Sequence, residues 1–474
     1  RLDNLQAGLP AYEGAEALEL AAPADVDVSP LDEHNVKLLD NVHPAKWLDP
    51  EPQPKYNMVV IGAGAGGLVS SSIAAGLGGK VAIIEEHLMG GDCLNVGCVP
   101  SKALIRAARA AHEARNASEF GVNTGEVTVD FGKVMERMRR LRAKISPVDS
   151  ASRYSELGVD VFQGRGKFTS KDTIEVNGKT LKFATAVIAT GGTPTLPPIP
   201  GLKDVPHMTN IQFFNQTELP KRFGVIGSGV IGLELAQCMQ RFGSQVTVFG
   251  RSGRILEKED EDAADVVKAQ LLKDGVDFKL KVKYQNISKA DNGEISIAVF
   301  NSETGADEVV AVDALLVATG RKPNVTGLGL DEAGVKFDPK VGITVDDNLR
   351  TSQKSIFAVG DCCSAYKFTH VADFMARMVA RNALFFGSAK FSSLLIPWAT
   401  FTEPEIAHVG LYEKDLQAQG IKYSTFVRML DDVDRAILDG EEEGFVKVHT
   451  AAGSDKILGA TIVSSTAGNM ISEI

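Results

Sequence analysis

The chain has few cysteines, few tryptophans and no long apolar run. Five cysteines and two tryptophans occur in 474 residues. Five cysteines are too few for a fold held together by disulfides, which predicts a soluble protein of a reducing compartment. No apolar run of about 18 residues occurs, so we expect no membrane span. Lys and Arg number 50 against 61 Asp and Glu, which argues against nucleic acid as a partner.

The composition is that of a large globular protein with an acidic, proline-rich start. Hydrophobic residues make up 44%, and the length predicts about three domains. Residues 1–55 hold eleven acidic and four basic residues and seven of the 19 prolines. We expect residues 1–56 to form an extended or partly helical arm, with 11–22 as its helical candidate, that either docks a protein partner or is a solvated spacer.

The first residue bears on location. The chain starts with Arg1 instead of methionine, so removal of a targeting sequence is one expectation, although the arm is too acidic for a transit peptide. The cytoplasm and an organelle matrix or stroma therefore both stay open.

Two cysteines lie five residues apart in a glycine-rich segment, residues 90–102, which reads Gly-Gly-Asp-Cys-Leu-Asn-Val-Gly-Cys-Val-Pro-Ser-Lys. Cys93 and Cys98 fall on nearly one side of a helix with about 3.6 residues per turn, so we expect them close enough to bridge once the glycines between and before them relax the backbone. A disulfide in so short a ring adds little stability, which favours a reactive role. A helix N-terminus and Lys102 would both favour thiolates. The alternative is two unrelated core cysteines.

A glycine fingerprint precedes the cysteines. An apolar strand, residues 56–61, runs into Gly62, Gly64 and Gly67, and a helix of small residues follows. Glycines at this spacing permit a tight turn, close approach to a pyrophosphate, and close packing of helix on strand. The next strand ends at Glu85, where a carboxylate accepts the hydroxyls of an adenosine ribose.

The fingerprint occurs a second time, with one change. A strand runs into Gly227, Gly229 and Gly232, and a helix and a strand follow. Gly250 and Arg251 stand at the end of that strand, where an acid is expected. Arg254 lies three residues later. A guanidinium binds a 2'-phosphate well, so the second site favours NADPH over NADH. A surface arginine is the alternative, and two glutamates nearby weaken the positive field.

Three further apolar strands end in residues suited to a nucleotide. One ends at Thr190 and Gly191, and a similar one ends at Gly320. A third closes on Gly-Asp at Asp361, whose carboxylate can hold sugar or ribityl hydroxyls.

In this order, the motifs resemble those of the flavoprotein disulfide reductases, the family of dihydrolipoyl dehydrogenase, glutathione reductase and mercuric reductase, over roughly residues 56–474. The resemblance implies an α/β fold with two Rossmann-like dinucleotide-binding domains and a C-terminal α+β interface domain that forms a homodimer. The implied domains are FAD-binding at 57–200 and 331–394, NAD(P)H-binding at 201–330, and interface at 395–474.

The resemblance also implies roles for single residues. The implied FAD contacts are Gly62, Gly64, Gly67, Glu85, Gly91, Asp92, Gly166, Thr190, Gly191 and Asp361. The implied nicotinamide nucleotide contacts are Gly227, Gly229, Gly232, Arg251 and Gly320. Cys98 would face the flavin, and Cys93 would meet the acceptor. Lys102 would pair with Glu234 near the flavin. Electrons would pass from NADPH through FAD to the Cys93–Cys98 disulfide, and then to a small-molecule or thiol-bound metal acceptor.

Within the family, the pattern is most similar to mercuric reductase. In lipoyl dehydrogenases, the second glycine fingerprint has a tyrosine at the position of Val230, and these enzymes usually have an acid at the position of Gly250. Both departures, and residues 434–436 in the interface domain, resemble mercuric reductases. Dihydrolipoyl dehydrogenase and a glutathione-type reductase stay as alternatives.

Two features of these enzymes have no counterpart in the sequence. Mercuric reductases use a C-terminal cysteine pair, and the disulfide reductases use a C-terminal His and Glu. The sequence stops at Ile474, short of the family's usual end, so we expect a lost tail, a fragment or a divergent protein. A non-catalytic structural or assembly subunit is therefore the second hypothesis.

The remaining cysteines are not expected to bind a metal. Adjacent Cys362 and Cys363 indicate packing beside the flavin, with metal handling as the alternative, and Cys238 is expected in the core.

Overall fold

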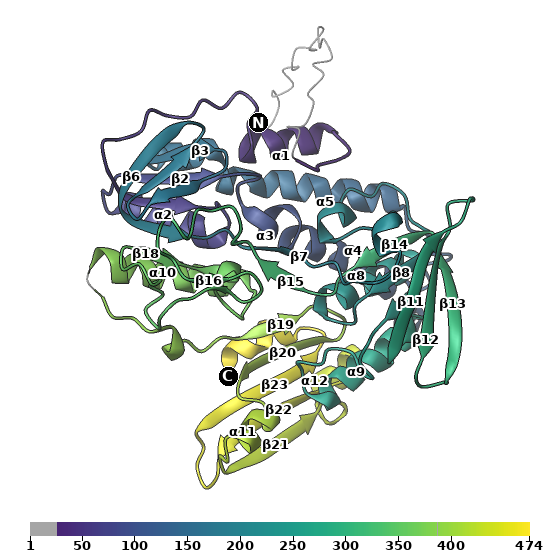
Figure 1. The fold of residues 1–474 in the computed structure, drawn as a ribbon. Helices are drawn as coiled ribbons and strands as arrows, with labels where there is room; N and C mark the ends of the chain where they lie inside the picture. Colours follow the sequence, from purple (N-terminus) through teal and green to yellow (C-terminus); the bar gives the residue numbers. More distant parts are fainter. Residues whose placement is uncertain (1–25, 386) are drawn as a thin grey trace, which may run out of the picture.

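The computed structural model describes residues 26–385 and 387–474, which form three lobes (Figure 1). Two lobes are built on parallel sheets with helices, and the third is built on an antiparallel sheet. This arrangement matches the predicted fold class. Within the described part of the chain, no helix is both long and apolar enough to cross a membrane.

The first lobe contains a parallel sheet with the strand order β3-β2-β1-β6 and with β18 on β6. Its strands are β1 (Tyr56–Ile61), β2 (Val81–Glu85), β3 (Val159–Gln163), β6 (Lys179–Ile188) and β18 (Ile356–Ala358), with β4 (Lys167–Ser170) and β5 (Thr173–Val176) continuing from β6. Its helices are α2 (Ala65–Gly76), α3 (Gly91–Asn95), α4 (Cys98–Asn116), α5 (Phe131–Ile145), α6 (Ala151–Glu156) and α10 (Thr369–Leu384). Strand β1 is buried at nearly every position because helices cover the sheet.

The second lobe repeats this plan. Its parallel sheet has the order β10-β9-β8-β14, and an antiparallel sheet, β11-β12-β13, packs beside it. The strands are β8 (Arg222–Ile226), β9 (Gln245–Phe249), β10 (Asp277–Lys279), β11 (Val282–Lys289), β12 (Ile295–Asn301), β13 (Ala306–Val312) and β14 (Ala314–Val317). The helices are α7 (Asn210–Phe213), α8 (Val230–Phe242) and α9 (Glu261–Lys273). Strands β7 (Gly192–Pro194) and β15 (Arg321–Pro323) pair where the chain passes between the lobes.

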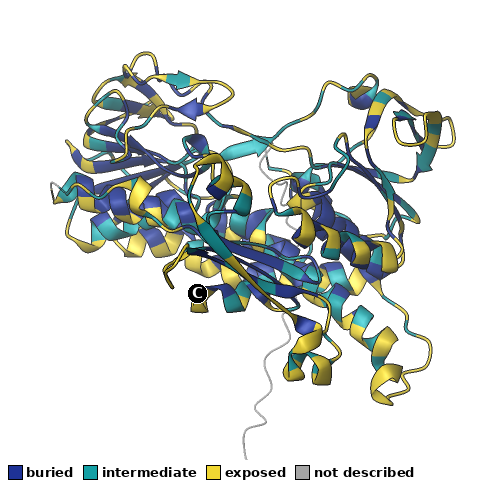
Figure 2. Cartoon of the chain, turned by 90° about the horizontal axis from the view of Figure 1, so that it is seen from below, coloured by how far each residue is buried: buried dark blue, intermediate teal, exposed yellow. Residues whose placement is uncertain are grey.

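The third lobe is an antiparallel sheet with the order β19-β20-β23-β22-β21. Its strands are β19 (Trp398–Thr400), β20 (Glu405–Gly410), β21 (Tyr423–Met429), β22 (Phe445–Ala451) and β23 (Ile457–Ser464), and its helices are α11 (Glu413–Ala418), α12 (Asp434–Asp439) and α13 (Ala467–Met470). The short strands β16 (Phe337–Asp338) and β17 (Gly342–Ile343) lie before it in the chain. Figure 2 shows the buried strands of this sheet between more exposed helices.

The N-terminal segment corrects one expectation. The helical candidate at residues 11–22 lies outside the described residues. Residues 26–55 are not a simple arm, because α1 (Glu33–Val42) packs on α5 and fully buries Leu38 and Val42. The sequence contained little indication of this helix, because the helix has few apolar residues among polar ones. Its stability comes from tertiary packing.

Candidate active site

The cysteine pair lies at a break between two helices. Cys93 belongs to α3, and Cys98 is the first residue of α4. The expectation that both lie on one helix was therefore wrong. Gly97 causes the break, because a Cβ at this position would lie 2.7 Å from the carbonyl oxygen of Asp92. The break places the two thiols in direct hydrogen-bond contact.

The two thiols differ in acidity. The hydrogen bond from Cys93 is the main cause that lowers the pKa of Cys98 to about 6, and the hydroxyl of Thr369 and the charge of Lys102 lower it further. The same thiol–thiol contact, together with burial, raises the pKa of Cys93. At neutral pH the reduced pair therefore carries its negative charge on Cys98 and its proton on Cys93.

Thr369 is a site residue that the sequence reading missed. It is the first residue of α10, and its Oγ1 lies 3.4 Å from Sγ of Cys98. The only sequence signal is its position a few residues after the Gly-Asp turn at Asp361. Because 271 positions separate Thr369 from Cys98, only the fold brings them together.

Lys102 and Glu234 join the two nucleotide-binding lobes. Nζ of Lys102 lies 3.1 Å from Oε2 of Glu234, whose side chain is buried. The other oxygen of Glu234 accepts a hydrogen bond of 2.9 Å from the backbone N–H of Phe401 in the third lobe. Nζ of Lys102 also lies 4.2 Å from the centre of the Phe401 ring. All three lobes therefore meet one turn of α4 away from Cys98.

The first glycine loop forms a cradle at the start of α2. A Cβ at Gly62 would lie 2.3 Å from the carbonyl oxygen of Ala189, and a Cβ at Gly67 would lie 1.8 Å from that of Gly62. Gly64 caps α2 without a side-chain hydrogen bond. The backbone N–H groups of the first turn thus stay available to a pyrophosphate, so the loop fits the ADP half of FAD.

Glu85 lies at the end of β2 beside this loop. Its carboxylate accepts hydrogen bonds from the backbone N–H of Ala63, at 2.5 Å, and of His87, at 2.8 Å. Burial raises its pKa, and the two bonds oppose that rise. These contacts fix the carboxylate at the position predicted to bind the adenosine ribose. Gly166 packs against Ile84 of the same strand and lines the same cavity.

The opposite end of the first site is organised by an arginine that sequence reasoning missed. Arg321 forms an ion pair with Asp92 and another with Asp361, the latter with 3.4 Å between Nε and Oδ2. Burial raises the pKa of Asp361, and the charge of Arg321 opposes that rise. Gly91 packs closely on Gly64, since a Cβ at Gly91 would lie 2.8 Å from Cα of Gly64.

The turns after β6 and β14 also face the cavity. Thr190 donates a hydrogen bond of 2.6 Å from its hydroxyl to the carbonyl oxygen of Asn324. Gly191 and Gly320 both have positive φ angles and space around their Cα atoms. The structure thus leaves the backbone of each turn open to a nucleotide.

The second glycine loop has the geometry of the first. A Cβ at Gly227 would lie 2.4 Å from the carbonyl oxygen of Ala318, and a Cβ at Gly232 would lie 2.2 Å from that of Gly227. Gly229 caps α8 without a side-chain hydrogen bond. The second loop therefore also fits a dinucleotide.

The two arginines after β9 have different surroundings. Arg251 is exposed and lines the cavity. Arg254 donates hydrogen bonds to the carbonyl oxygens of Glu257, at 2.7 Å, and Glu259, at 3.0 Å. Its guanidinium is thus engaged by the backbone, and Arg254 does not line the cavity. Glu259 is buried and accepts a hydrogen bond of 3.1 Å from Trp398.

One cavity of about 2540 Å³ connects these features. Its lining includes both glycine loops, both cysteines, Lys102 and Glu234. This volume is larger than that of a typical small-molecule site, which is about 300–1,000 Å³. The arrangement can therefore carry electrons from a nucleotide at the second loop to the thiol pair.

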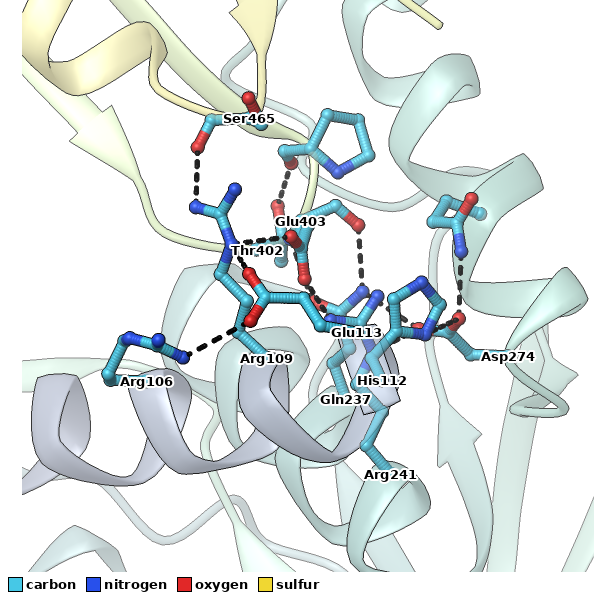
Figure 3. A network of polar contacts seen from close by, with 12 residues as sticks. Arg106, Arg109, His112, Glu113, Gln237, Arg241, Asp274, Thr402, Glu403 and Ser465 are labelled. Atoms are coloured by element: carbon cyan, nitrogen blue, oxygen red, sulfur yellow. Dashed lines mark hydrogen bonds and ion pairs between the residues drawn. The ribbon is translucent and has the colours of Figure 1, made fainter. Parts of the chain in front are cut away.

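A polar network fixes the helix that carries Cys98 (Figure 3). Arg109 of α4 forms ion pairs with Glu403, at 3.1 Å, and Glu441, at 3.2 Å, both in the third lobe. Glu403 also pairs with Arg241 of α8, which in turn lies 2.8 Å from Asp274. The network locks α4 against both other lobes and thereby holds Cys98 in place.

The other cysteines are in the interior. Cys238 and Cys362 are buried, and Cys363 is half-buried. The thiol of Cys362 donates to the carbonyl oxygen of Val359 at 3.2 Å. Among the described residues, no cluster of three His, Cys, Asp or Glu side chains has the arrangement of a metal site.

Comparisons with known proteins agree with this geometry. Residues 56–376 match the pyridine nucleotide-disulphide oxidoreductase family, and residues 396–474 match its dimerisation domain. Mercuric reductase of Staphylococcus aureus is 35% identical over 416 residues, which are 88% of this chain and 76% of the relative. Mitochondrial dihydrolipoyl dehydrogenase of Dictyostelium discoideum is 34% identical over 428 residues, with 88% and 87% covered.

A solved structure shows the same fold. The Cu(II) complex of the HOCl-induced flavoprotein disulfide reductase RclA from Escherichia coli superposes with a TM-score of 0.78 at 27% identity, covering 88% of this chain and 91% of that chain. The family match covers more than half of this chain, and the relatives align along most of it. The chain therefore belongs to the pyridine nucleotide-disulphide oxidoreductase family, which is FAD- and pyridine nucleotide-dependent.

Proposed function

We propose that this protein is an NADPH-dependent FAD enzyme that reduces a thiol-reactive acceptor, Hg(II) above all, through Cys93 and Cys98. The observation that carries this proposal is the hydrogen-bonded thiol pair, with one acidic member, in the cavity that both glycine loops line. A pair of structural cysteines has no need of this asymmetry.

The first glycine loop, Glu85 and Asp361 would hold FAD. When bound, FAD supplies the passage of an electron pair from NADPH to the Cys93–Cys98 disulfide. The protein provides the geometry for this transfer. Reduction adds two electrons and one proton to the disulfide at neutral pH, because Cys98 stays a thiolate while Cys93 takes the proton.

Cys93 is the thiol that we assign to the acceptor. Cys93 lines the cavity together with Cys98, which is the more exposed of the two, and Thr369 and Lys102 stabilise the thiolate of Cys98 and leave the proton on Cys93. Cys93 loses its proton when it attacks a disulfide or coordinates a metal. The neighbouring thiolate of Cys98 accepts that proton through the hydrogen bond that already joins the two sulfurs.

The Lys102–Glu234 pair holds a positive charge beside the thiolate. Lys102 lowers the pKa of Cys98, and Glu234 raises it. Because Glu234 is buried and is also bonded to Phe401, it fixes the ammonium group at one position. The pair therefore stabilises negative charge near Cys98 without a large reorganisation.

Arg251 supports NADPH as the electron donor. It directly follows Gly250, which has the position that Glu85 has in the first lobe, and it is exposed and lines the cavity. A free guanidinium next to the ribose binds a 2'-phosphate, and no carboxylate occupies the end of β9 to repel it.

The residues at three positions of the second lobe favour Hg(II) over lipoamide as the acceptor. Val230, Gly250 and Arg251 depart from the lipoyl dehydrogenase pattern, and several bacterial mercuric reductases align along most of the chain. Hg(II) is a soft ion that binds thiolates strongly. Because the Dictyostelium relative is a dihydrolipoyl dehydrogenase, lipoamide is the alternative acceptor.

We also propose that the third lobe forms a homodimer. It matches the dimerisation domain of the family, and its strand β21 exposes Phe426, Val427 and Met429. Apolar side chains on neighbouring positions of an edge strand are typical of a surface that a second subunit covers.

An anaerobic titration tests the proposal. The FAD-loaded protein is reduced with NADPH, and long-wavelength absorbance is followed for the band that a thiolate next to the flavin produces. We expect the band to form with one equivalent of NADPH and to decay on addition of Hg(II) in the presence of a small thiol. Cys98→Ser is the control, because it removes the thiolate and must remove the band.

Three results would overturn parts of the proposal. Decay with lipoamide but not with Hg(II) would replace the acceptor. Equal reduction by NADH would remove the preference for NADPH. Bound flavin that NADPH does not reduce would contradict the enzyme reading and would favour a non-catalytic role.

A further inference from the structure

The N-terminal helix contacts the redox loop although it lies outside the family match. The match begins at residue 56, and α1 precedes it. Figure 1 shows α1 lying along α5, and α5 in turn contacts α3. Several hydrogen bonds run from α1 and its flanks to the segment that carries Cys93.

The first connection passes through a buried arginine. Arg142 of α5 has an exposed fraction of 1%. Its Nη2 donates to Oδ1 of Asn35 in α1 at 2.7 Å, and its Nη1 donates to the carbonyl oxygen of Asn95 at 2.6 Å. Asn95 is the last residue of α3, two positions after Cys93. The guanidinium thus spans the distance from α1 to the end of the cysteine helix.

A second connection holds the start of the same loop. The backbone N–H of Met89 donates to the carbonyl oxygen of Val42 at 3.0 Å. The imidazole of His43 contacts the carbonyl oxygen of His87. Residues 87–95 are therefore held by the N-terminal segment at both ends, and Cys93 lies between the two points of attachment.

The segment also reaches the second lobe. Asn215 donates from Nδ2 to Oδ1 of Asp27 at 2.9 Å, and it accepts a hydrogen bond of 3.2 Å from the backbone N–H of Ser29. Val26 and Val28 line the central cavity. The N-terminal segment thus links the cysteine loop to the nucleotide-binding lobe across the cavity wall.

The position of Asn35 is itself well fixed. Its Nδ2 donates to the carbonyl oxygen of Pro30 at 2.7 Å, and its backbone N–H donates to Oδ1 of the capping residue Asp32 at 2.9 Å. Asp32 also pairs with Arg139 of α5 at 2.5 Å. Asn35 therefore offers Arg142 a rigid acceptor, which fixes the direction of the guanidinium.

We propose that residues 26–43 are a brace that holds Cys93 within bonding reach of Cys98, with Asn35 and Arg142 as its positioning residues. The proposal rests on the redox role that we assign to the pair. Two thiols close a disulfide more readily when both are held in place, because the protein raises their effective concentration for each other.

The thiol–disulfide equilibrium measures this effect directly. In a dithiothreitol buffer at neutral pH, Cys93 and Cys98 lose two electrons and the one proton of Cys93 to form their disulfide, and oxidised dithiothreitol takes up the two electrons, that proton and one proton from water and becomes a dithiol. The FAD-loaded protein is equilibrated anaerobically, quenched by alkylation and analysed by peptide mass spectrometry. We expect Asn35→Ala to lower the disulfide-to-dithiol ratio at least about threefold.

Matched variants separate positioning from stability. Asn41→Ala also removes an amide of α1, which donates to Oγ of Ser146 at 2.9 Å and does not touch Arg142. It is expected to lower the thermal midpoint as Asn35→Ala does, and to leave the ratio unchanged. Asn35→Asp keeps the oxygen that Arg142 needs and restores the ratio. Arg142→Lys, which keeps the charge but cannot bridge both oxygens, lowers it and serves if Asn35→Ala does not fold.

Equal shifts in Asn35→Ala and Asn41→Ala, or no shift in Asn35→Ala and Arg142→Lys, would overturn the brace. The measurement needs no NADPH. A shifted equilibrium in a protein that NADPH does not reduce would therefore support the brace and contradict the proposed function.

Discussion

The two nucleotide-binding lobes each contain a glycine loop of the same geometry, but different elements cover the two loops. Gly62 and Gly227 both have positive φ angles, and a Cβ at either would lie within 2.4 Å of a carbonyl oxygen. In the first lobe, α2 packs under α10, and a Cβ at Gly66 would lie 2.8 Å from Val359. In the second lobe, α8 begins with Val230 and Ile231, which are 36% and 38% exposed.

The difference in cover separates a resident cofactor from one that exchanges. We expect a nucleotide at the first loop to leave slowly, because α2 packs against α10. A nucleotide at the open start of α8 can enter and leave in each turnover. The same loop thus serves two kinetic roles, and the surrounding elements decide which.

The second difference is chemical and lies at the end of the second strand. Glu85 accepts two backbone hydrogen bonds and presents a carboxylate. Gly250 cannot be replaced by an acid without movement, since a Cβ there would lie 2.8 Å from Leu280 and 2.9 Å from Ser228. Under the proposed function, we therefore expect the first lobe to bind an unmodified ribose and the second lobe a phosphorylated one.

The largest effect is expected when one glycine of each glycine loop is replaced by alanine, first in one lobe and then in the other. Gly67→Ala places a Cβ 1.8 Å from the oxygen of Gly62, so we expect purified protein with less than about a tenth of the wild-type flavin. Gly232→Ala makes the equivalent clash at 2.2 Å, and we expect it to keep flavin but to slow reduction by NADPH at least about 100-fold. Flavin absorbance per protein and stopped-flow reduction measure the two effects. Loss of flavin in both variants would mean that the lobes are not independent.

The second prediction concerns the phosphorylated ribose. Arg251→Ala removes charge-assisted hydrogen bonds worth about 1.5–3 kcal/mol, so kcat/KM for NADPH falls roughly 10- to 100-fold. The value for NADH stays unchanged because NADH lacks the phosphate. Steady-state rates with both nucleotides give the ratio. Arg254→Ala is the control, since its guanidinium bonds carbonyl oxygens, and equal losses with both nucleotides in Arg251→Ala would argue against a phosphate contact.

The comparison also shows what the sequence could reveal. Both glycine loops, the acid at Glu85 and the arginine at Arg251 are local patterns, so their elements were predictable. Thr369 and Arg321 reach the site only through tertiary packing, and no local pattern marks them. The break at Gly97 was missed because helical periodicity takes no account of the close approach of two backbones.

The third prediction uses the Lys102–Glu234 ion pair, which joins the two nucleotide-binding lobes near the thiols. The hydrogen bond from Cys93 is the main cause that lowers the pKa of Cys98 to about 6, the charge of Lys102 lowers this pKa further, and the charge of Glu234 raises it. Substitutions of Lys102 and Glu234 must therefore act in opposite directions. In the reduced protein, Lys102→Met moves the pH midpoint of thiolate formation up by about one unit, and Glu234→Gln moves it down by a smaller amount. The thiolate predominates above the midpoint, so Lys102→Met loses thiolate absorbance near neutral pH. Shifts of the same sign would contradict the assigned charges.

The smallest effect is expected at the hydroxyl that α10 offers to Cys98, a contact for which the second lobe has no counterpart among the described residues. Thr369→Val keeps the shape and removes the hydroxyl that lies 3.4 Å from the sulfur. One lost hydrogen bond raises the midpoint of thiolate formation by about half a unit. Ser101→Ala is the matched control, because its hydroxyl bonds the carbonyl oxygen of Cys98 at 3.3 Å and not the sulfur. A pH titration of charge-transfer absorbance resolves such a shift. If both variants titrate alike, α10 covers the first site but does not tune its thiolate.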